Sequence, residues 1–170
     1  MEKMPFNPQR HHRRSIRLKG YDYAQPGGYF VTFCVREHAC ELGQIIDGKM
    51  TLSDTGRIVH DFWIQIPVHF PNVSVDMFVV MPNHVHAILM IEGRGGVTPP
   101  LRPTLGQIVA YYKHQTTAQI NQLDDNAGAP FWQRGYYERI IRNERDLQAI
   151  RKYILENPLK WELDQENPAL

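Results

Sequence analysis

Met81-Pro82-Asn83-His84-Val85-His86-Ala87-Ile88-Leu89-Met90-Ile91 is the stretch around which this chain is organised, because it predicts a buried strand with two histidines on one face. Side chains alternate between the faces of a β-strand, so His84 and His86 project from the same side and Val85 points away. Pro82 has no N–H to donate to a sheet, which predicts a sharp turn just before the strand. Two neighbouring imidazoles can share one cation, although a His-x-His pair also occurs in strands that bind no metal.

The composition is that of one globular domain without a membrane anchor. The chain has 170 residues, of which 42% are hydrophobic and 22% charged, and this length allows a sizeable buried core. We find no apolar run of the roughly 20 residues that would span a bilayer. The N-terminus lacks the apolar segment of a signal peptide, which predicts a cytoplasmic protein. Cys34 and Cys40 are too few for a disulfide framework and are expected to be free thiols.

Positive charge is concentrated locally. The net charge is only +1, which argues against a basic field over the whole molecule. A basic N-terminal arm, residues 1–22, carries Arg13, Arg14, Arg17 and Lys19 and ends near Tyr21. Such a run is either a solvated surface or a contact for nucleic acid, and the arm alone does not decide between them.

Periodicity and turn residues predict alternating strands and helices. Strands are expected at 29–36, 76–80, 84–91 and 131–142, a hairpin at 43–52 around Asp47-Gly48, and helices from Ser53 to before Pro67, from Thr104 to about 121 and from Asn143 to about 155. Residues 93–103 form a Gly/Pro-rich loop. This order predicts an α+β sandwich in which helices pack on a central, mainly antiparallel sheet.

The last predicted helix carries a second set of polar side chains. Tyr153 and Asn157 lie four residues apart and therefore share one face of the helix. Such a tyrosine is often packed at the edge of a core, and an asparagine before a proline often just ends a helix. Combined with His84 and His86, however, Asn157 could complete a site for Mg²⁺ or Mn²⁺, with Tyr153 as a covalent nucleophile one helical turn away.

Three motifs in order carry a family resemblance. Met81–His86, the run Trp132-Gln133-Arg134-Gly135-Tyr136-Tyr137, and Tyr153–Pro158 resemble the single-tyrosine HUH (IS200-like) transposases, and most closely the REP-associated tyrosine transposases. The resemblance implies a ferredoxin-like, RRM-like fold and a Mg²⁺ or Mn²⁺ ion held by His84, His86 and Asn157. It further implies that Tyr153 attacks a scissile phosphate in single-stranded DNA, which yields a 5′-phosphotyrosine and a free 3′-hydroxyl.

The same resemblance implies a DNA partner and a domain organisation. In that family, residues before the first strand help to read a short sequence beside a DNA hairpin. By position, the candidate DNA contacts are Arg13, Arg14, Arg17, Lys19, Tyr21, Lys113 and Arg134. The expected divisions are the arm at 1–22, the transposase domain at 23–163 and a tail at 164–170. We expect a monomer that binds single-stranded DNA with hairpins and does not bind membranes.

Two other functions remain open from the residues alone. One is a DNA-hairpin-binding regulator that has lost catalysis, although such a binder has no need of His84, His86, Tyr153 and Asn157 together. The other is a metal phosphodiesterase that uses water, which predicts turnover without a covalent protein–DNA adduct. Replacement of Tyr153 by Phe would separate all three.

Overall fold

A four-stranded antiparallel sheet forms the centre of the molecule. In the computed structural model, which describes residues 18, 20–93, 103–164 and 166–168, its strands are β1 (Gly27–Cys34), β4 (Val73–Val80), β5 (His84–Ile91) and β6 (Tyr137–Ile141). The spatial order is β4-β5-β1-β6, with every neighbouring pair antiparallel. This arrangement confirms the predicted α+β class and the ferredoxin-like sandwich.

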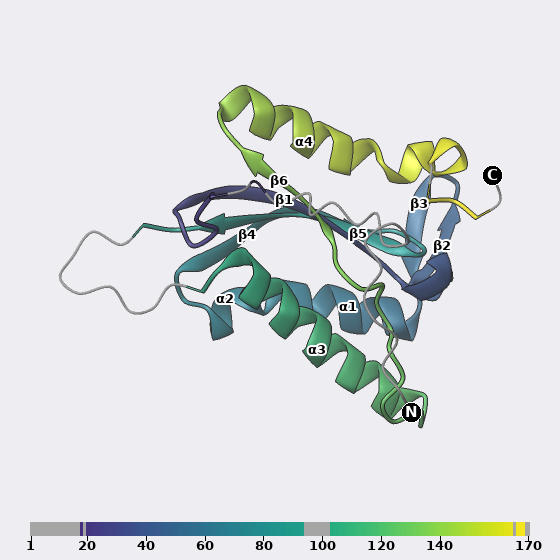
Figure 1. Cartoon of the computed structure of the whole chain (residues 1–170). Coiled ribbons are helices and arrows are strands. Elements are labelled where there is room, and N and C mark those ends of the chain that lie inside the picture. The colour runs from purple at the N-terminus through teal and green to yellow at the C-terminus, as the bar shows by residue number, and fades with distance from the viewer. Residues whose placement is uncertain (1–17, 19, 94–102, 165, 169–170) are drawn as a thin grey trace, which may run out of the picture.

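Helices cover the two faces of the sheet unequally (Figure 1). α1 (Asp54–Ile64), the short α2 (Ile66–His69) and α3 (Leu105–Leu123) lie on one face, and α4 (Glu144–Glu156) lies on the other. Successive side chains of β5 point to opposite faces of the sheet. Val85 and Leu89 belong to the larger core, between the sheet and α1 and α3, whereas Ile88 belongs to the smaller core, between the sheet and α4. His84 and His86 have the parity of Ile88, so they face α4.

The three longer helices, α1, α3 and α4, each begin at a capping residue that the sequence predicts, whereas α2 has no side-chain cap. The Ser53 hydroxyl accepts from the Gly56 N–H, Thr104 forms a capping box with Gln107, and the Asn143 side chain accepts from the Asp146 N–H. These bonds satisfy backbone donors that the first helical turn leaves unpaired. The last cap matters most for function, because it fixes where α4 starts and thus which of its residues stand over β5.

The predicted hairpin is also confirmed. β2 (Gly43–Ile46) pairs with β3 (Lys49–Leu52) in a separate two-stranded sheet. Asp47 and Gly48 both have positive φ, 50° and 71°, as the tight turn of a two-residue hairpin requires. A six-residue 3₁₀ segment, η2 (Pro158–Leu163), follows α4 and contacts β3.

The prediction of one strand over 131–142 is wrong in its first half. Only Tyr137–Ile141 forms β6, and Trp132 makes a single bridge to Val35. The Trp132 indole is buried, packs edge-on against Phe33 and donates to Thr116 Oγ1 at 2.9 Å. The Lys113 ammonium binds the carbonyls of Gln133 and Gly135, which draws this segment away from the sheet. Tertiary contacts therefore override the strand preference of these aromatic residues.

Two smaller differences concern boundaries. Pro67 does not simply end the first helix: α1 stops at Ile64, and the proline occupies the first turn of α2, where a missing N–H is tolerated. β4 begins at Val73, earlier than predicted, and has an irregularity between Val75 and Phe78. Most of the predicted loop, residues 94–102, lies outside the described residues. Among the described residues, no helix is long and apolar enough to cross a membrane.

Candidate active site

The centre of the site is the pair of histidines at the start of β5. His84 and His86 are buried, with 0% and 5% of their surface exposed. Their Nε2 atoms lie 3.1 Å apart. Met81-Pro82-Asn83 forms the predicted turn, closed by a hydrogen bond from the Met81 N–H to the His84 carbonyl at 2.8 Å. The rigid turn therefore sets the position of the first histidine, and the pleat of the strand places the second beside it.

Neighbouring polar groups fix the orientation of both rings. The buried Asn83 amide donates from Nδ2 to the carbonyls of His38 and Glu166, at 3.0 and 2.6 Å. Its Oδ1 therefore faces His84 Nδ1, at 2.8 Å, and accepts a hydrogen bond from the ring N–H. This assigns the His84 tautomer with an unprotonated Nε2, the form that binds a metal. His86 Nδ1 lies 2.7 Å from the Thr32 hydroxyl on β1, which holds the second ring in the same way.

Burial keeps both imidazoles neutral. Burial lowers the pKa of His84 to about 4, against an opposing effect of Asp164. Burial, and then the neighbouring His84, lower the pKa of His86 well below its usual value. Neutral imidazoles are the state that binds metal, whereas imidazolium ions are not ligands.

Tyr153 reaches the histidines from α4. Its hydroxyl lies 3.1 Å from His86 Nε2, although the two residues are 67 positions apart. The ring packs edge-on against Phe30 and remains 44% exposed. Burial raises the pKa of Tyr153, and Asp164 raises it further. The structure therefore brings together the predicted nucleophile and the predicted metal-ligating pair.

Asn157 also lies where the sequence predicts. It follows α4 as its C-cap, and its side chain is buried beside His84 and Tyr153. Its Oδ1 atom is shielded from solvent and forms no hydrogen bond within the described part of the chain. A buried carbonyl oxygen without a partner is costly. Because Asn157 lines the cavity of the site, we interpret its side chain as a candidate oxygen donor.

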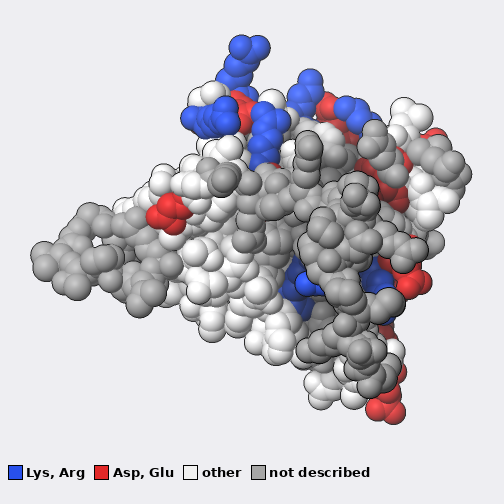
Figure 2. All heavy atoms as spheres, viewed as in Figure 1, with Lys and Arg blue, Asp and Glu red and all other residues white. Residues whose placement is uncertain are grey.

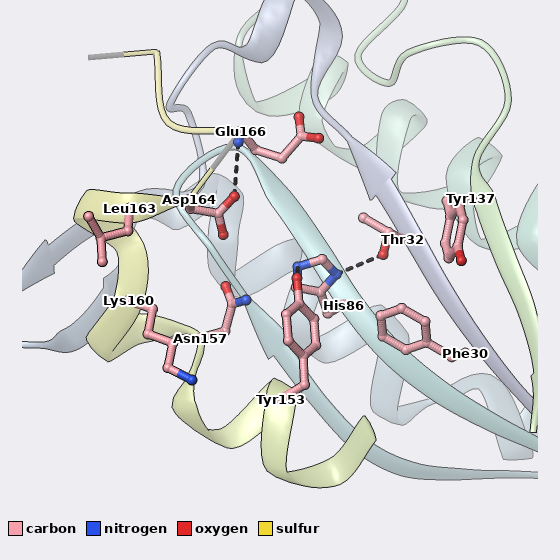
Figure 3. Close-up of a pocket in the computed structure, with 10 residues that line it drawn as sticks. All are labelled: Phe30, Thr32, His86, Tyr137, Tyr153, Asn157, Lys160, Leu163, Asp164 and Glu166. Atoms are coloured by element: carbon pink, nitrogen blue, oxygen red, sulfur yellow. Dashed lines mark hydrogen bonds between the residues drawn. The ribbon is translucent and has the colours of Figure 1, made fainter. Parts of the chain in front are cut away.

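One further oxygen donor is not predicted by the sequence. Asp164 follows η2, and its Oδ2 lies 3.9 Å from His84 Nε2. Ligand atoms of Asp164, His84 and His86 all lie within 4.8 Å of one another. No pattern in the sequence marks this aspartate, which lies in a polar C-terminal segment; only the turn of η2 brings it back over β5 (Figure 3).

The donor set fits a divalent cation. Two ligands at neighbouring positions of an octahedral Mg²⁺ or Mn²⁺ ion stand about 3 Å apart, given bond lengths of about 2.1 Å. The two Nε2 atoms meet this condition at 3.1 Å. Facing lone pairs repel one another, so a cation or a proton between them is needed to stabilise the pair. The unpartnered Asn157 Oδ1 and the Asp164 carboxylate add the oxygen donors that hard cations prefer.

The site opens into a cavity at the surface of the molecule. Its volume is about 610 Å³, and its lining includes Tyr153, His86, Asn157 and Asp164 (Figure 3). Phe30 and the half-exposed Tyr137 form an apolar wall next to Tyr153, and Lys160 lines the cavity from η2. Tyr153 is therefore nearly half exposed to solvent, whereas His84 and His86 are buried.

The residues predicted to contact DNA lie in different places. Arg13, Arg14, Arg17 and Lys19 fall outside the described residues. Tyr21 packs against Tyr23 and Tyr29 at the edge of the larger core. Lys113 and Arg134 line a separate cavity near the end of α3. Burial lowers the pKa of Lys113 to about 8, and its ammonium already binds two backbone carbonyls.

Figure 2 shows where charge gathers on one face of the molecule. Lys and Arg side chains cluster at the top, over α4, with acidic side chains between them. Arg145 and Lys152 of that helix are exposed.

Comparisons with known proteins agree with this geometry. The chain is 40% identical to an uncharacterized Haemophilus influenzae protein, over 94% of this chain and 96% of that one. It is 25% identical to a second H. influenzae protein, provisionally named a REP-associated tyrosine transposase, over 82% and 74% of the two chains.

Solved structures of transposases share the fold. One is a REP-associated tyrosine transposase bound to a REP hairpin (TM-score 0.57, 20% identity, 87% of this chain and 74% of that one). Another is a provisionally named transposase from Deinococcus radiodurans (TM-score 0.50, 18% identity, 84% and 98%). The model of the family described as "Transposase IS200 like" matches residues 69–157, more than half of the chain, and this range includes His84, His86, Tyr153 and Asn157. The chain therefore belongs to the IS200-like transposase family.

Proposed function

We propose that this transposase is a metal-dependent endonuclease and strand transferase for single-stranded DNA, with Tyr153 as its nucleophile. The observation that carries the proposal is the contact between the Tyr153 hydroxyl and His86 Nε2, which lie 3.1 Å apart. The same His86 Nε2 lies 3.1 Å from Nε2 of the second imidazole, His84. A tyrosine packed only for stability needs neither a solvent-accessible hydroxyl nor two neutral histidines beside it.

His84, His86 and Asn157 would hold Mg²⁺ or Mn²⁺, with Asp164 as an additional oxygen donor. When bound, such a cation polarises the scissile phosphate and stabilises charge on the leaving oxygen. Thr32 and Asn83 keep the two imidazoles in place, because each binds the ring nitrogen that faces away from the other histidine. The burial of His84 and His86 excludes water from the ligands.

Tyr153 forms the covalent intermediate. Its oxygen attacks the phosphorus and forms the new ester bond, and the bond from phosphorus to the 3′-oxygen breaks. The phenol loses its proton, and the leaving 3′-oxygen gains one. The products are a 5′-phosphotyrosine and a 3′-hydroxyl, and a later attack by a 3′-hydroxyl on the ester rejoins DNA. Because burial raises the pKa of Tyr153, the phenol is protonated at neutral pH until substrate binds.

The substrate we propose is DNA that contains a hairpin, by analogy with the solved transposase bound to a REP hairpin. The process would be DNA transposition or the mobilisation of REP-type palindromes. The arm at 1–22 would contact phosphates, which makes binding salt-dependent. Three further points stay predictions: that the protein acts as a monomer, that it is located in the cytoplasm at the nucleoid, and that its transposase domain spans residues 23–163. The contacts of Asp164 and Glu166 with the site indicate that the functional unit extends to these residues.

The test uses DNA hairpins taken from the sequence that flanks the gene, labelled at either end, with and without Mn²⁺. Tyr153→Phe should bind the hairpin with unchanged affinity and yield no cleavage. Tyr137→Phe is the matched control, because Tyr137 lines the same cavity and is similarly exposed, 49% against 44%. It should cleave as the wild type does.

Other outcomes identify the other functions. Cleavage products that persist in Tyr153→Phe and carry no protein would indicate a phosphodiesterase that uses water. Binding without cleavage on every hairpin, in the presence of either metal, would indicate a regulator. Either result would overturn the proposed mechanism.

A further inference from the structure

Three side chains with different metal-binding atoms meet beside the candidate active site. They are Cys34 at the end of β1, His38 in the 3₁₀ turn η1 (Arg36–His38), and Glu166 near the C-terminus. Their ligand atoms, a sulfur, a ring nitrogen and a carboxylate oxygen, all lie within 4.8 Å of one another. The proposed transposase chemistry uses none of them.

The distances suit a tetrahedral ion. The Cys34 Sγ lies 3.7 Å from Glu166 Oε2, and a zinc ion with ordinary bond lengths separates a sulfur and an oxygen ligand by about 3.6 Å. His38 Nδ1 lies 2.8 Å from the same oxygen, against about 3.4 Å between nitrogen and oxygen ligands of zinc. A small rotation of the Glu166 side chain, which ends a flexible stem, supplies the difference.

Neighbouring groups hold the His38 ring in place. Its Nε2 accepts from the Gln133 side-chain N–H at 2.8 Å, and its carbonyl accepts from Asn83. Binding of a metal through Nδ1 would move the ring proton to Nε2, and the Gln133 amide would then turn so that its oxygen accepts from this N–H. His38 Nδ1 is shielded from solvent and, despite its short distance to Glu166, is not aligned for a hydrogen bond to any described residue.

The local backbone is also unusual. Glu37 and His38 both have positive φ, 58° and 54°, which non-glycine residues adopt rarely and at a cost. This conformation belongs to the turn that follows β1 and brings the His38 side chain within 4.8 Å of Cys34. The arrangement is held by contacts with two distant segments, the Gln133 amide and the C-terminal Glu166.

We propose that Cys34, His38 and Glu166 form a second cation site, selective for a borderline-soft ion such as Zn²⁺. A thiolate selects Zn²⁺ over Mg²⁺ and Mn²⁺, which prefer oxygen donors. Three protein ligands leave a fourth position for water. Cys34 pairs with His84 across β1 and β5, so this ion would lie next to the transposase site and tie the C-terminal segment to β1.

Binding must release a proton. Burial raises the pKa of the Cys34 thiol to about 12, and Glu166 raises it further. The free protein therefore holds a neutral thiol at pH 8. When Zn²⁺ binds, the S–H bond is lost, the sulfur–metal bond forms, and the proton passes to solvent. Nothing is oxidised or reduced.

The experiment titrates the full-length, chelator-treated protein with Co²⁺, a spectroscopic substitute for Zn²⁺. Wild-type protein should develop a thiolate-to-cobalt charge-transfer band that saturates with added Co²⁺ and disappears when Zn²⁺ is added. Cys34→Ser should lose the band. Cys40→Ser is the matched control, because Cys40 is the other free cysteine and is exposed, and it should retain the band.

Two further measurements keep the result independent of the transposase site. The double variant His84→Ala, His86→Ala should retain the charge-transfer band, whereas His38→Ala should weaken Zn²⁺ binding at least tenfold. Titration of a weakly buffered solution should show release of about one proton per Zn²⁺ at pH 8 in the wild type and none in Cys34→Ser.

The proposal is overturned if the wild type shows no charge-transfer band, or if the band survives in Cys34→Ser but not in Cys40→Ser. Loss of the band in the His84, His86 double variant, with circular dichroism unchanged, would equally contradict it, because the band would then depend on residues outside the proposed ligand set. None of these outcomes bears on the covalent chemistry of Tyr153, so the two proposals succeed or fail separately.

Discussion

Asn83 connects the turn, the histidine pair and the C-terminal segment, so its replacement by Ala should affect both stability and metal binding. The side chain is fully buried and makes three hydrogen bonds, to His84 Nδ1 and to the carbonyls of His38 and Glu166. Ala removes all three and leaves the buried His84 N–H without an acceptor.

The magnitude follows from these contacts. Each hydrogen bond contributes about 0.5–1.5 kcal/mol net, and a buried donor left unpaired costs about 1–3 kcal/mol. Shared relaxation reduces the sum, so we expect Asn83→Ala to lower the free energy of unfolding by about 2–5 kcal/mol. Loss of the group that fixes the His84 tautomer should also weaken Mn²⁺ binding by about 10- to 100-fold.

Asn83→Asp separates the two effects. The carboxylate still accepts from His84 Nδ1, but it cannot donate to the two carbonyls and is repelled by them. We therefore expect a loss of stability of at least the same size, with Mn²⁺ affinity close to that of the wild type. Urea unfolding in the presence of chelator measures the first quantity, and the paramagnetic resonance of free Mn²⁺ measures the second. Equal Mn²⁺ affinity of the wild type and Asn83→Ala would refute this role for Asn83.

Three further predictions test other parts of the account. Thr32→Val, which is nearly isosteric, should weaken Mn²⁺ binding about tenfold because it removes the hydrogen bond that holds His86 Nδ1. It should leave the urea midpoint nearly unchanged. An equal loss of stability and of Mn²⁺ affinity would count against a positioning role for Thr32. The Arg151 guanidinium binds the Asp76 carboxylate, which joins α4 to β4 and lowers the pKa of Asp76. This ion pair therefore stabilises the fold at pH values above the unfolded pKa of about 3.9. Its contribution is lost as the pH falls through the lower pKa of the folded protein. Asp76→Asn should therefore lower the urea midpoint at pH 7 by more than at acid pH, where the carboxyl group is protonated in the folded protein as well, and a constant difference would contradict the assignment. In Gly56→Ala the new Cβ would lie 2.0 Å from the Leu42 carbonyl oxygen, which should lower the free energy of unfolding by about 1–3 kcal/mol or more; Arg57→Ala, at an exposed neighbouring position, is the control for helix propensity in thermal unfolding.

Features that depend on neighbours in the sequence could be predicted. Ser53, Thr104 and Asn143 mark helix starts because a cap is a bond to a backbone group three residues on. The alternation of His84, Val85 and His86 predicts which side chains share a face, because the pleat has a period of two.

Features that depend on distant segments could not be predicted. Thr32 stands beside His86 only because the two residues face each other across β1 and β5. Asp164 reaches His84 only after α4 and η2 have returned the chain to the site. The segment from 131 to 136 has the composition of a strand, but Lys113 and the Trp132 pocket hold it away from the sheet.

The central claim is that Tyr153 forms the covalent bond to DNA. The most direct measurement is mass spectrometry of the protein after it has reacted with a hairpin substrate and Mn²⁺, followed by digestion with trypsin and nuclease. We predict a nucleotide attached through its 5′-phosphate to the peptide that contains Tyr153, and no adduct in the absence of metal. An adduct on Tyr137 or another tyrosine, or cleaved DNA without any adduct, would contradict it.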